Sequence, residues 1–432
     1  MVGETEVHPT RYGCAICEQQ SVYPLLDFIG LIEHEVQREE GPAETRLIKC
    51  TRNAAASIAL VCAETPFHNA TAIVKQLTGV DLDTMTAFRV TDSVGSEFVE
   101  QPPTEADDDR MAVIAEKLAD NTLKTRFEQL KLAENLDEII ADMALDGSEG
   151  VLRKDYKGPI IRVVYIQADG TGVPGRRIEL AGVKGKQPDG SAKTFEAKVG
   201  AVFVVEYTDN WQPLLKDNGE LYRDKVVKYM GTVRKVDDFG PMLAQFTLEN
   251  GLADADAVVF LGDGARWIRG IQEKYFPFAI VGIDLYHAIE RVGLLMDHLQ
   301  FKGQSSKENK EKFKLECISF LKQGKIQNML DRIMEIPCKV KHETKLVSAL
   351  DYFRSNMDRM NYGVFTALGL YVGSGVIEAA CKVIVGSRMK NAGMHWSKAN
   401  AEKLISLRCA IRNKVFLDAY LPNRCSSVLP AA

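Results

Sequence analysis

The sequence predicts an α/β protein in which a mixed five-stranded sheet lies between two helical regions. Between Pro159 and His287 the chain carries five short apolar runs rich in Val, Ile and Phe. Runs of this length and composition, bounded by turn residues, are typical of strands. Helical periodicity precedes these runs, resumes after Asp284 and continues to about Tyr420.

The composition is that of a folded soluble protein. The chain has 432 residues, of which 46% are hydrophobic, and is long enough for about two or three domains. Nine scattered cysteines do not form a disulfide framework, and no basic and apolar leader opens the chain, so a reducing cytoplasm is expected. The longest apolar runs fall well short of the ~20 residues that cross a membrane, so no membrane partner is expected.

The net charge of −5 conceals a split between two parts of the chain. Residues 286–432 hold 23 Lys and Arg against 13 Asp and Glu, whereas the remainder is acidic. A basic C-terminal third can face the phosphate backbone of a nucleic acid. A solvated helical surface without a partner explains the same charge equally well.

Residues 1–50 contain one CxxC knuckle, Cys14 and Cys17. A structural zinc ion needs four ligands, usually from two knuckles, and no second CxxC follows. Other side chains could complete a site only at a spacing unlike that of a zinc ribbon: Cys50, Cys62 or His68. The segment is therefore interpreted as a partial zinc-ribbon-like N-terminus, with two reduced thiols on a turn as the alternative.

Residues 51–99 predict three short helices, with breaks at 65–69 and 78–84. Gly79 is expected to end the second helix, and Asp81 or Asp83 to cap the third. Three helices with a tight turn suit a helix-turn-helix whose last helix enters a major groove. A plain three-helix support module is the alternative. The expected apolar stripes are Ala55, Ile58, Ala59 and Cys62, then Ala70, Ile73, Val74 and Leu77, then Met85, Phe88, Val90 and Val94, and the expected DNA-facing side chains are Thr84, Thr86, Arg89 and Thr91.

Residues 100–150 combine a linker with helices. The stretch "EQPPTEADDDR" at 100–110 joins two prolines to a run of acids, which favours a linker. Helical periodicity follows from Met111 to about Leu145.

The five strand-like runs divide into two groups. The first three are separated by turn-rich stretches and are expected to pair antiparallel, whereas the last two flank a helix-like stretch and are expected to be parallel. The runs are 159–168, 197–207, 227–234, 257–262 and 278–286.

Three acids are candidates for chemistry. Asp169 and Asp263 each precede a glycine at the expected end of a strand, and acids at strand ends can converge on one rim of a sheet. Each DG pair taken alone is more often a turn. Glu378 lies in "YVGSGVIEAACK", in the first turns of a helix that Ser374 is expected to cap.

Three carboxylates in a half-buried place repel one another unless a cation lies among them. Hard oxygen ligands select Mg²⁺ or Mn²⁺. Two such ions about 3.5–4 Å apart activate a water or a 3′-hydroxyl for in-line attack on a phosphate. The set therefore predicts a metal site for phosphodiester chemistry.

Together with their flanking residues, these three acids make the sequence resemble DDE transposases of the RNase H-like superfamily, most closely the Kra-type insertion-sequence family. The likeness is carried by "VYIQADGTGVPGR" around Asp169, "VVFLGDGARWI" around Asp263, "FPFAIVGIDLYHAIE" around Asp284 and His287, and "LYVGSGVIEAACKVIVGSRMKNAGMHWS" around Glu378. The N-terminal "CAICEQQSVYPLLDFIGL" and "ETPFHNATAIVKQLTGVDLDTMTAFRVTDSVG" also resemble that family, so nearly the whole chain is covered. A DGA triplet alone is weak, whereas its combination with DxxH and GSGxxE in this order is specific.

The resemblance implies an RNase H-like core over 151–287, an all-α insertion over 288–361, and a catalytic helix with C-terminal helices over 362–432. It implies that Asp169, Asp263 and Glu378 are catalytic metal ligands for two Mg²⁺ or Mn²⁺ ions. The implied partners are double-stranded DNA, as element ends and target, and further copies of the chain on that DNA. The implied location is a bacterial cytoplasm, at the nucleoid when DNA is bound.

The resemblance also implies supporting roles. Asp284 and His287 match a motif that supports the active site and positions DNA, although a capping Asp and a packed His explain them equally well from the residues alone. Beyond Glu378, expected DNA contacts are Lys382, Arg388, Lys390, His395 and Trp396, with surface charge and a core aromatic as the alternative.

One departure from the family concerns zinc, because only the second knuckle of its zinc ribbon, Cys14 and Cys17, is present. The sequence therefore predicts a transposase that cuts and joins DNA at the ends of its element. The alternatives are a non-catalytic DNA-binding protein derived from a transposase and a metal-dependent nuclease of the same fold.

Overall fold

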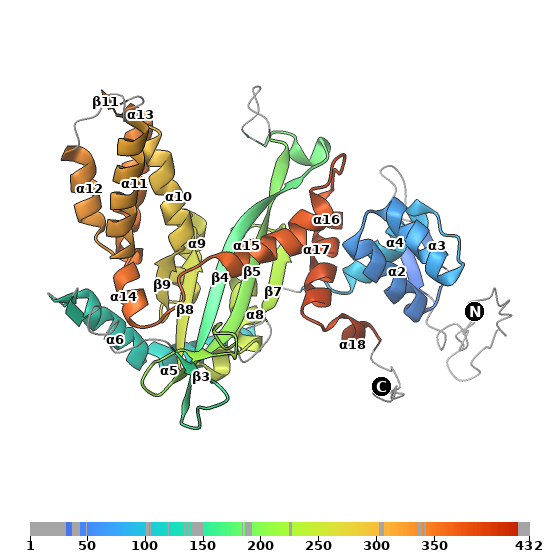
Figure 1. The fold of residues 1–432 in the computed structure, drawn as a ribbon. Helices are drawn as coiled ribbons and strands as arrows, with labels where there is room; N and C mark the ends of the chain where they lie inside the picture. The colour runs from blue at the N-terminus through green and yellow to red at the C-terminus, as the bar shows by residue number, and fades with distance from the viewer. Residues whose placement is uncertain are drawn as a thin grey trace.

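The computed structural model in Figure 1 describes two N-terminal strands and most of the chain from residue 50 to residue 421. The gaps fall within 37–43, 49, 101–104, 120, 134–149, 184–191, 224–226, 302–305, 336–338 and 341–342. Cys14 and Cys17, the expected zinc ligands, lie outside the described residues.

The N-terminal unit contains the three predicted helices, after a hairpin of β1 (Ile32–Val36) and β2 (Glu44–Ile48). The helices are α2 (Arg52–Glu64), α3 (Phe67–Thr78) and α4 (Thr84–Ser96). Gly79 ends α3 in the left-handed region at φ +77°, and Asp83 caps α4 by accepting hydrogen bonds from the amides of Met85 and Thr86. Both local signals therefore act as expected.

The packing of this unit differs from the expected stripes at its edge. Most of the predicted apolar positions are buried, but Ile73, Leu77 and Met85 are 38%, 75% and 55% exposed. Thr91, expected to face DNA, is buried, and its hydroxyl donates to the carbonyl of Ala87. The reason is that Thr91 lies beside the thiol of Cys62, on the side of α4 that packs against α2. The helix α17 (Lys398–Arg412) covers a neighbouring side of α4, where Lys403 Nζ lies 2.7 Å from Asp92 Oδ2.

The predicted linker is shorter than expected because a helix, α5 (Glu105–Ala119), begins inside it, and α6 (Thr122–Lys131) follows. An acidic run suits the first turn of a helix as well as a linker, since carboxylates are favoured at the positive end of the helix dipole.

The central sheet has five strands in the order β7-β5-β4-β8-β9. Their bounds are β4 (Ile160–Pro174), β5 (Thr194–Thr208), β7 (Lys228–Thr232), β8 (Ala257–Gly262) and β9 (Ile280–Ile283). The first three pair antiparallel, and β8 pairs parallel to both β4 and β9, which are its neighbours. The helix α9 (Arg266–Tyr275) connects β8 to β9. The predicted mixed sheet and its pairing are therefore confirmed.

The strand β4 is longer than predicted. Asp169 does not end it: β4 loses its partner β8 after Gln167 but stays paired with β5 through Pro174. The β4–β5 ladder thus extends beyond the rest of the sheet as an arm, green in Figure 1. A short parallel pair, β3 (Val151–Leu152) and β6 (Leu214–Leu215), lies apart from the main sheet.

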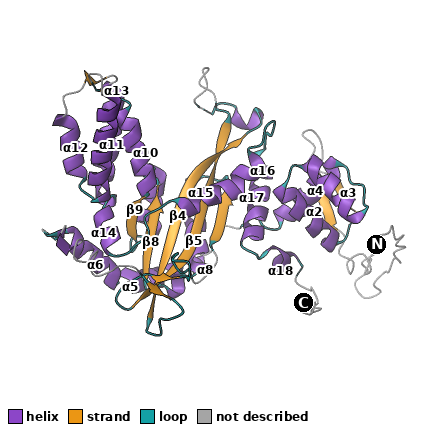
Figure 2. Cartoon of the chain, in the orientation of Figure 1, coloured by secondary structure: helices purple, strands orange, loops and turns teal. Residues whose placement is uncertain are grey.

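Helices cover both faces of the sheet, as Figure 2 shows. Val163 and Tyr165 of β4 face one core together with the helix segment from residue 375 and α17, whereas Val164 and Ile166 face a second core with α8 (Val236–Glu249) and α9. A sheet buried on both faces needs apolar side chains at odd and even positions alike, which explains the continuous apolar runs.

The predicted all-α insertion forms a helical lobe with its own core. It contains α10 (Leu285–Met296), β10 (Leu299–Gln300), α11 (Ser306–Lys322), α12 (Ile326–Glu335), β11 (Lys339–Val340), α13 (Glu343–Asn356) and α14 (Tyr362–Ala367). Apart from the two-residue strands β10 and β11, which pair with each other, its described elements are helical. Among the described residues, no helix is both long and apolar enough to cross a membrane.

The C-terminal helix that carries Glu378 runs from residue 375 to residue 389. It consists of α15 (Gly375–Ala380), a π-helical turn at Cys381–Gly386, and α16 (Ser387–Met389). Two further helices follow, α17 and α18 (Phe416–Tyr420).

Two predicted DNA contacts on this helix and the loop after it are core residues instead. Arg388 is fully buried, and its Nε donates to the carbonyl of Cys62 at 2.8 Å. Trp396 is buried as well, and its indole N–H donates to the carbonyl of Met389. Burial lowers the pKa of Arg388 to about 10. The physical reason is that Cys62 lies in the last turn of α2, where the carbonyls lack partners within the helix.

We predict opposite effects of alanine at two helical glycines. A Cβ at Gly95 would lie 2.8 Å from the backbone oxygen of Lys403, so Gly95→Ala should push α4 from α17 and destabilise the protein by about 1–3 kcal/mol. A Cβ at the exposed Gly270 meets nothing, so Gly270→Ala should stabilise it by roughly 0.5–1 kcal/mol. Chemical denaturation of both variants tests this, and a Gly95→Ala protein as stable as wild type would contradict the described contact.

Candidate metal centre

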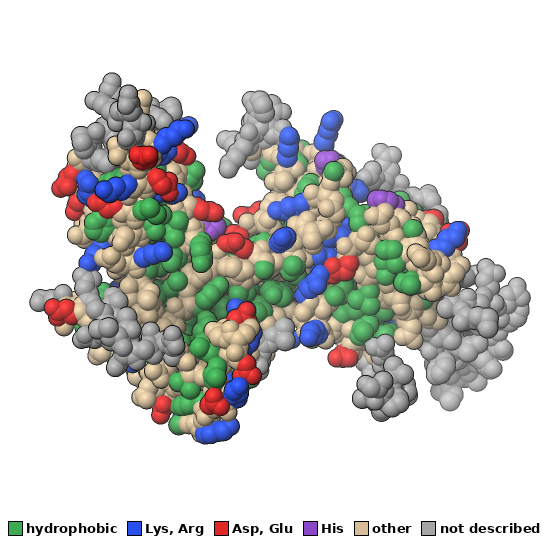
Figure 3. Space-filling view, in the orientation of Figure 1, with side chains coloured by type: hydrophobic (Ala, Val, Ile, Leu, Met, Phe, Trp, Pro, Cys, Tyr) green, Lys and Arg blue, Asp and Glu red, His purple; other side chains and the backbone are tan. Residues whose placement is uncertain are grey.

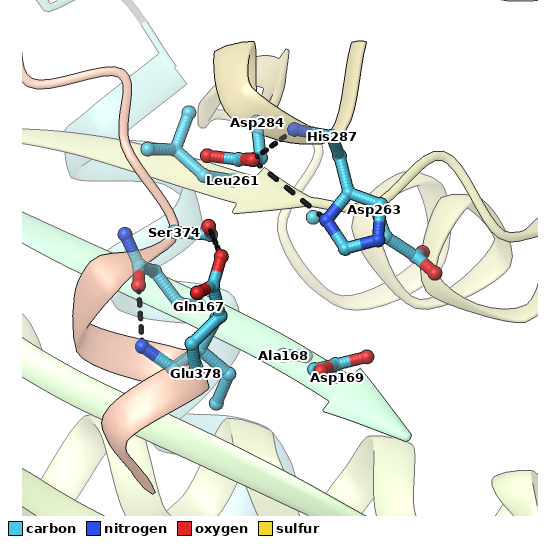
Figure 4. Close-up of a pocket in the computed structure, with 11 residues that line it drawn as sticks. Gln167, Ala168, Asp169, Leu261, Asp263, Asp284, His287, Ser374 and Glu378 are labelled. Atoms are coloured by element: carbon cyan, nitrogen blue, oxygen red, sulfur yellow. Dashed lines mark hydrogen bonds and ion pairs between the residues drawn. The ribbon is translucent and has the colours of Figure 1, made fainter. Parts of the chain in front are cut away.

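A cavity lies where β4, β8, α10 and α15 meet, and it has room for about one water-sized particle, about 10 Å³. Figure 4 shows the residues that line it, and the five predicted polar residues are among them: Asp169, Asp263, Asp284, His287 and Glu378. The acids and the histidine come from four separate elements, so the fold brings together residues more than 200 positions apart.

Asp263 directly follows β8, as predicted, and begins the tight turn into α9. Its Oδ1 accepts from the amide of Ala265 at 2.8 Å, and Gly264 adopts φ +86°. A side chain at Gly264 would also approach Tyr352 of α13, whose hydroxyl donates to the carbonyl of Asp263 at 3.0 Å. The helical lobe thereby contacts the loop that presents the acid, a contact that the sequence does not signal.

Asp284 combines a cap with an unused ligand atom. Its Oδ1 accepts a hydrogen bond from the amide of His287 at 2.6 Å and so caps α10, which is the capping role that the residues alone predict. Its Oδ2, however, is buried and has no hydrogen-bond partner among the described residues. Asp284 as a residue is only 1% exposed. A carboxylate oxygen without a partner is costly at such a buried position, and a cation would satisfy it.

Glu378 is presented by an unexpected anchor. Ser374 does not cap α15, because its hydroxyl donates to Glu378 Oε1. The anchor is Gln167 of β4, a residue that the sequence analysis missed: its Nε2 donates to the carbonyl of Gly373 at 2.8 Å, and its Oε1 accepts from the amide of Ile377 at 3.0 Å. The sequence signal that could have identified Gln167 was a single amide side chain inside the apolar run "VVYIQA".

Burial is graded across the cavity. Asp284 is buried, Asp169, Asp263 and His287 are half-buried, and Glu378 is exposed, contrary to the half-buried position expected for it. The cavity therefore opens to solvent on the side of α15 and is closed at the sheet.

The tightest group of ligand atoms is not the expected triad. Among the described residues, only Asp284, His287 and Glu378 offer ligand atoms that all lie within 4.8 Å of one another. Asp169 and Asp263 line the same cavity but stand outside this group. The three grouped residues can hold a metal ion, so Asp284 and His287 are candidate ligands as well as supporting residues.

The electrostatics of the cavity favour a cation. Burial raises the pKa of Asp284 and of Asp169, and the nearby charge of Asp263 raises the pKa of Asp169 further. Cys381, another residue not singled out from the sequence, lies with its Sγ 3.6 Å from Asp169 Oδ2, and burial also raises the pKa of this thiol, which therefore donates to the carboxylate. A bound cation would relieve the repulsion among these groups.

The remaining predicted DNA contacts differ in exposure. Lys382 and Lys390 are exposed, and Lys390 Nζ donates to Thr171 on the β4–β5 arm at 2.6 Å. At the start of α4, Thr84 is exposed and Arg89 is half-buried, but the Thr86 hydroxyl donates to Asp83 and so belongs to the helix cap.

The surface is hollowed between the helical lobe and the β4–β5 arm, as Figure 3 shows. Acidic and histidine side chains gather low in this hollow, and Lys and Arg side chains gather over the arm and the adjoining helix. Acidic and basic side chains thus border the same hollow.

A scan against protein-family models and a search of curated proteins found no match to this chain. Arguments about its function therefore rest on the chemistry of the cavity and on the sequence motifs.

We predict that Asp284→Asn removes metal binding but raises the stability of the metal-free protein. Because the folded pKa of Asp284 is raised, its ionised form destabilises the fold, and that loss grows as the pH rises through the folded pKa. Asn keeps the cap without the charge, so at neutral pH the gain should be about 1 kcal/mol. Thermal denaturation with and without Mn²⁺ measures both effects.

Asp83→Asn is the matched control, since Asp83 is also a helix cap but is exposed and has a lowered pKa. It should leave the stabilisation by Mn²⁺ unchanged. An Asp284→Asn protein that Mn²⁺ stabilises as much as wild type would exclude Asp284 as a ligand.

Proposed function

We propose that the protein is a metal-dependent DNA transposase with an RNase H-like core, which cleaves phosphodiester bonds at the ends of its element and transfers the freed strand. The observation that carries this proposal is the convergence of Asp169, Asp263 and Glu378, with Asp284 and His287, on one cavity. The mixed five-stranded sheet and the helical segment before Glu378 agree with the architecture that the family resemblance implies.

The donor set fits Mg²⁺ or Mn²⁺. Four of the five residues predicted for this site offer carboxylate oxygens, the ligands that these hard cations prefer. The imidazole of the fifth, His287, adds a nitrogen that Mn²⁺ accepts more readily than Mg²⁺. When bound, such ions polarise the phosphoryl oxygen and make a water or hydroxyl nucleophilic at neutral pH. In this proposal Asp169, Asp263 and Glu378 hold the two ions that the resemblance implies, of which the cavity, with room for about one water-sized particle, takes one.

The chain's own residues have distinct tasks. Glu378 on the exposed side can hold an ion at the place where a phosphate would enter, and Gln167 fixes the start of its helix. His287 Nδ1 lies 3.7 Å from Asp284 Oδ1, so the buried carboxylate orients the imidazole toward the cavity. Lys382 and Lys390 are exposed and follow Glu378 in the chain, so they can contact a DNA backbone.

The proposal extends to partners and location. Joining two element ends requires that both be held together, so a homo-oligomer assembled on DNA is part of it. The three-helix unit α2–α4 would contribute to DNA binding through the exposed start of α4, where Thr84 lies. A bacterial cytoplasm, at the nucleoid, is the corresponding location.

Nicking of a labelled duplex that carries the element's own end, with Mn²⁺, tests the function. Asp263→Asn and Glu378→Gln should each reduce cleavage more than about 100-fold, because loss of a ligand exceeds the usual cost of losing its supporting partner. Affinity for the duplex, measured by fluorescence anisotropy, should stay within about twofold, since each change leaves the exposed lysines in place.

Asp418→Asn, an exposed carboxylate on α18, is the matched control and should cleave like wild type. If wild type and Glu378→Gln bind the duplex and neither cleaves it, the protein is the non-catalytic DNA-binding alternative. Cleavage that ignores the element's end would indicate the nuclease alternative.

A further inference from the structure

The β4–β5 arm carries an exposed apolar side chain at its tip. The ladder of the two strands continues to Pro174, and the amide of Gly175 then donates to the carbonyl of Lys193 at 3.2 Å. The chain turns there in a short 3₁₀ helix, Ile178–Leu180. Ile178 is 81% exposed, although isoleucine is among the residues most often buried in proteins.

Packing inside the arm fixes the direction of this side chain. A 3₁₀ helix has three residues per turn, so Ile178, Glu179 and Leu180 point to three different sides. Leu180 takes the inner side: it is buried, and it packs with Phe195 over Gly175, where a Cβ would lie 2.9 Å from Leu180 and 3.0 Å from Phe195. Ile178 is consequently held away from the core of the arm.

The arm is braced along its length by the segment that follows α15. The amide of Trp396 donates to the carbonyl of Pro174 at 2.9 Å, and the amide of Arg176 donates to that of Trp396 at 3.0 Å. Lys390 Nζ donates to the hydroxyl of Thr171 at 2.6 Å. The tip of the arm therefore has a fixed position relative to the strand that enters the metal cavity.

The exposed side chains that flank Ile178 are basic. Arg176 and Arg177 precede it, Lys193 lies across the ladder, and all three are exposed. Glu179, the acid of this turn, is half-buried. Figure 3 shows Lys and Arg side chains gathered over the arm. An apolar side chain between exposed cations suits a partner that has anions outside and an apolar stack inside, which describes duplex DNA.

We propose that Ile178 is a wedge that enters the minor groove of duplex DNA and inserts between two stacked base pairs, while the flanking cations contact phosphates. Isoleucine is among the side chains that DNA-bending proteins insert in this way, and the inserted side chain unstacks the step and kinks the duplex. Two-stranded ribbons are known to enter DNA grooves. A second copy of the chain fits less well, because a symmetric contact would set these cations against themselves.

The inference deepens the proposed function and rests on it, because the arm prolongs the strand that carries Asp169. Pro174 lies five residues further along β4, which is about 17 Å, or about five base pairs of duplex. A duplex that runs along the arm from the metal cavity would therefore meet Ile178 at least about five base pairs from the bond that is cut. A kink there would fix the register of the element's end at the metal site.

The fluorescence of 2-aminopurine, an adenine analogue that brightens when it unstacks, tests the wedge without metal or cleavage. The probe is a duplex that carries the element's own end, labelled in turn at each adenine between about four and about ten base pairs from the bond. Wild type should raise the fluorescence at least about twofold at a single step and leave the other positions unchanged. Ile178→Ala should remove the rise and weaken the affinity about fivefold, since the wedge stabilises the kinked complex.

Three further variants define the role of the side chain. Leu132→Ala is the matched control, since Leu132 is 84% exposed but lies at the end of α6, outside the arm, and it should leave the rise unchanged. Ile178→Leu keeps an apolar wedge and should retain the rise. Arg177→Ala should keep the position of the rise but reduce the salt dependence, lowering the slope of log affinity against log salt by about one. All of these positions are exposed, so the fold should be unaffected.

Duplex binding by wild type without a rise at any position would overturn the inference, and so would a rise that Ile178→Ala retains. An oligomeric state that Ile178→Ala changes without DNA, measured by light scattering, would overturn it too if the rise is unaltered, and would assign the tip to contacts between copies. Nicking of the same duplex with Mn²⁺ but without a rise would contradict the wedge alone. A rise without nicking would support the wedge and contradict the proposed catalysis, and absence of duplex binding would contradict both.

Discussion

The position of the candidate metal site depends on one buried amide, that of Gln167. This side chain holds the start of α15 through Gly373 and Ile377, which lie 206 and 210 positions later in the chain. Because side chains alternate along a strand, Gln167 and Asp169 point to the same face, toward α15. One strand therefore supplies both an acid of the cavity and the anchor of the helix that carries Glu378. An apolar residue at 167 would leave a carbonyl and an amide of that helix start without partners, so the acids would lose their mutual position before losing any ligand atom.

A second constraint joins this helix to the three-helix unit. Arg388 and Arg408 are both fully buried, and they donate to the carbonyls of Cys62 and Ala63 at the end of α2. Arg408 also donates to Ile384 and Val383, carbonyls of the π-helical turn. Buried charges are costly, and here carbonyl oxygens with few other partners satisfy them at the negative end of α2. The three-helix unit α2–α4 and the helix that carries Glu378 are consequently packed together. A force applied to α2–α4 by DNA would reach the metal cavity through about three turns of helix, since the segment from residue 378 to residue 389 is continuous.

The sequence predicted what local patterns determine. The five apolar runs identified the strands because the sheet is buried on both faces, and Asp263 was placed correctly because β8 ends where its run ends. Asp169 was assigned to a strand end because "DGTGVP" reads as a turn, yet the pairing with β5 continues through it. Arg388 was expected at the surface because nothing near it in the sequence shows that its acceptor lies 326 positions away. Ser374 was expected to cap α15 because serine is a common capping residue. The side chain of Gln167, on strand β4, accepts the hydrogen bond at the start of α15 instead. These three errors concern partners distant in sequence: the strand β5 for Asp169, Cys62 for Arg388, and Gln167 for the start of α15.

The graded burial of the cavity explains how a metal site and a substrate entrance can share it. Asp284 at the closed end is hidden from water with one oxygen unpartnered, so its charge has no solvent to stabilise it and is available to a cation. Glu378 at the open end is exposed and carries no such penalty, so its carboxylate can exchange water for a cation at little cost. An ion held from the closed side would thus present its remaining positions to solvent, where an anionic phosphate oxygen could bind the ion. Had all the acids been buried, the cavity would bind a cation more tightly but would have no face to offer to DNA. Had all been exposed, hydration would compete for every ligand, so the gradient in burial suits the proposed metal site.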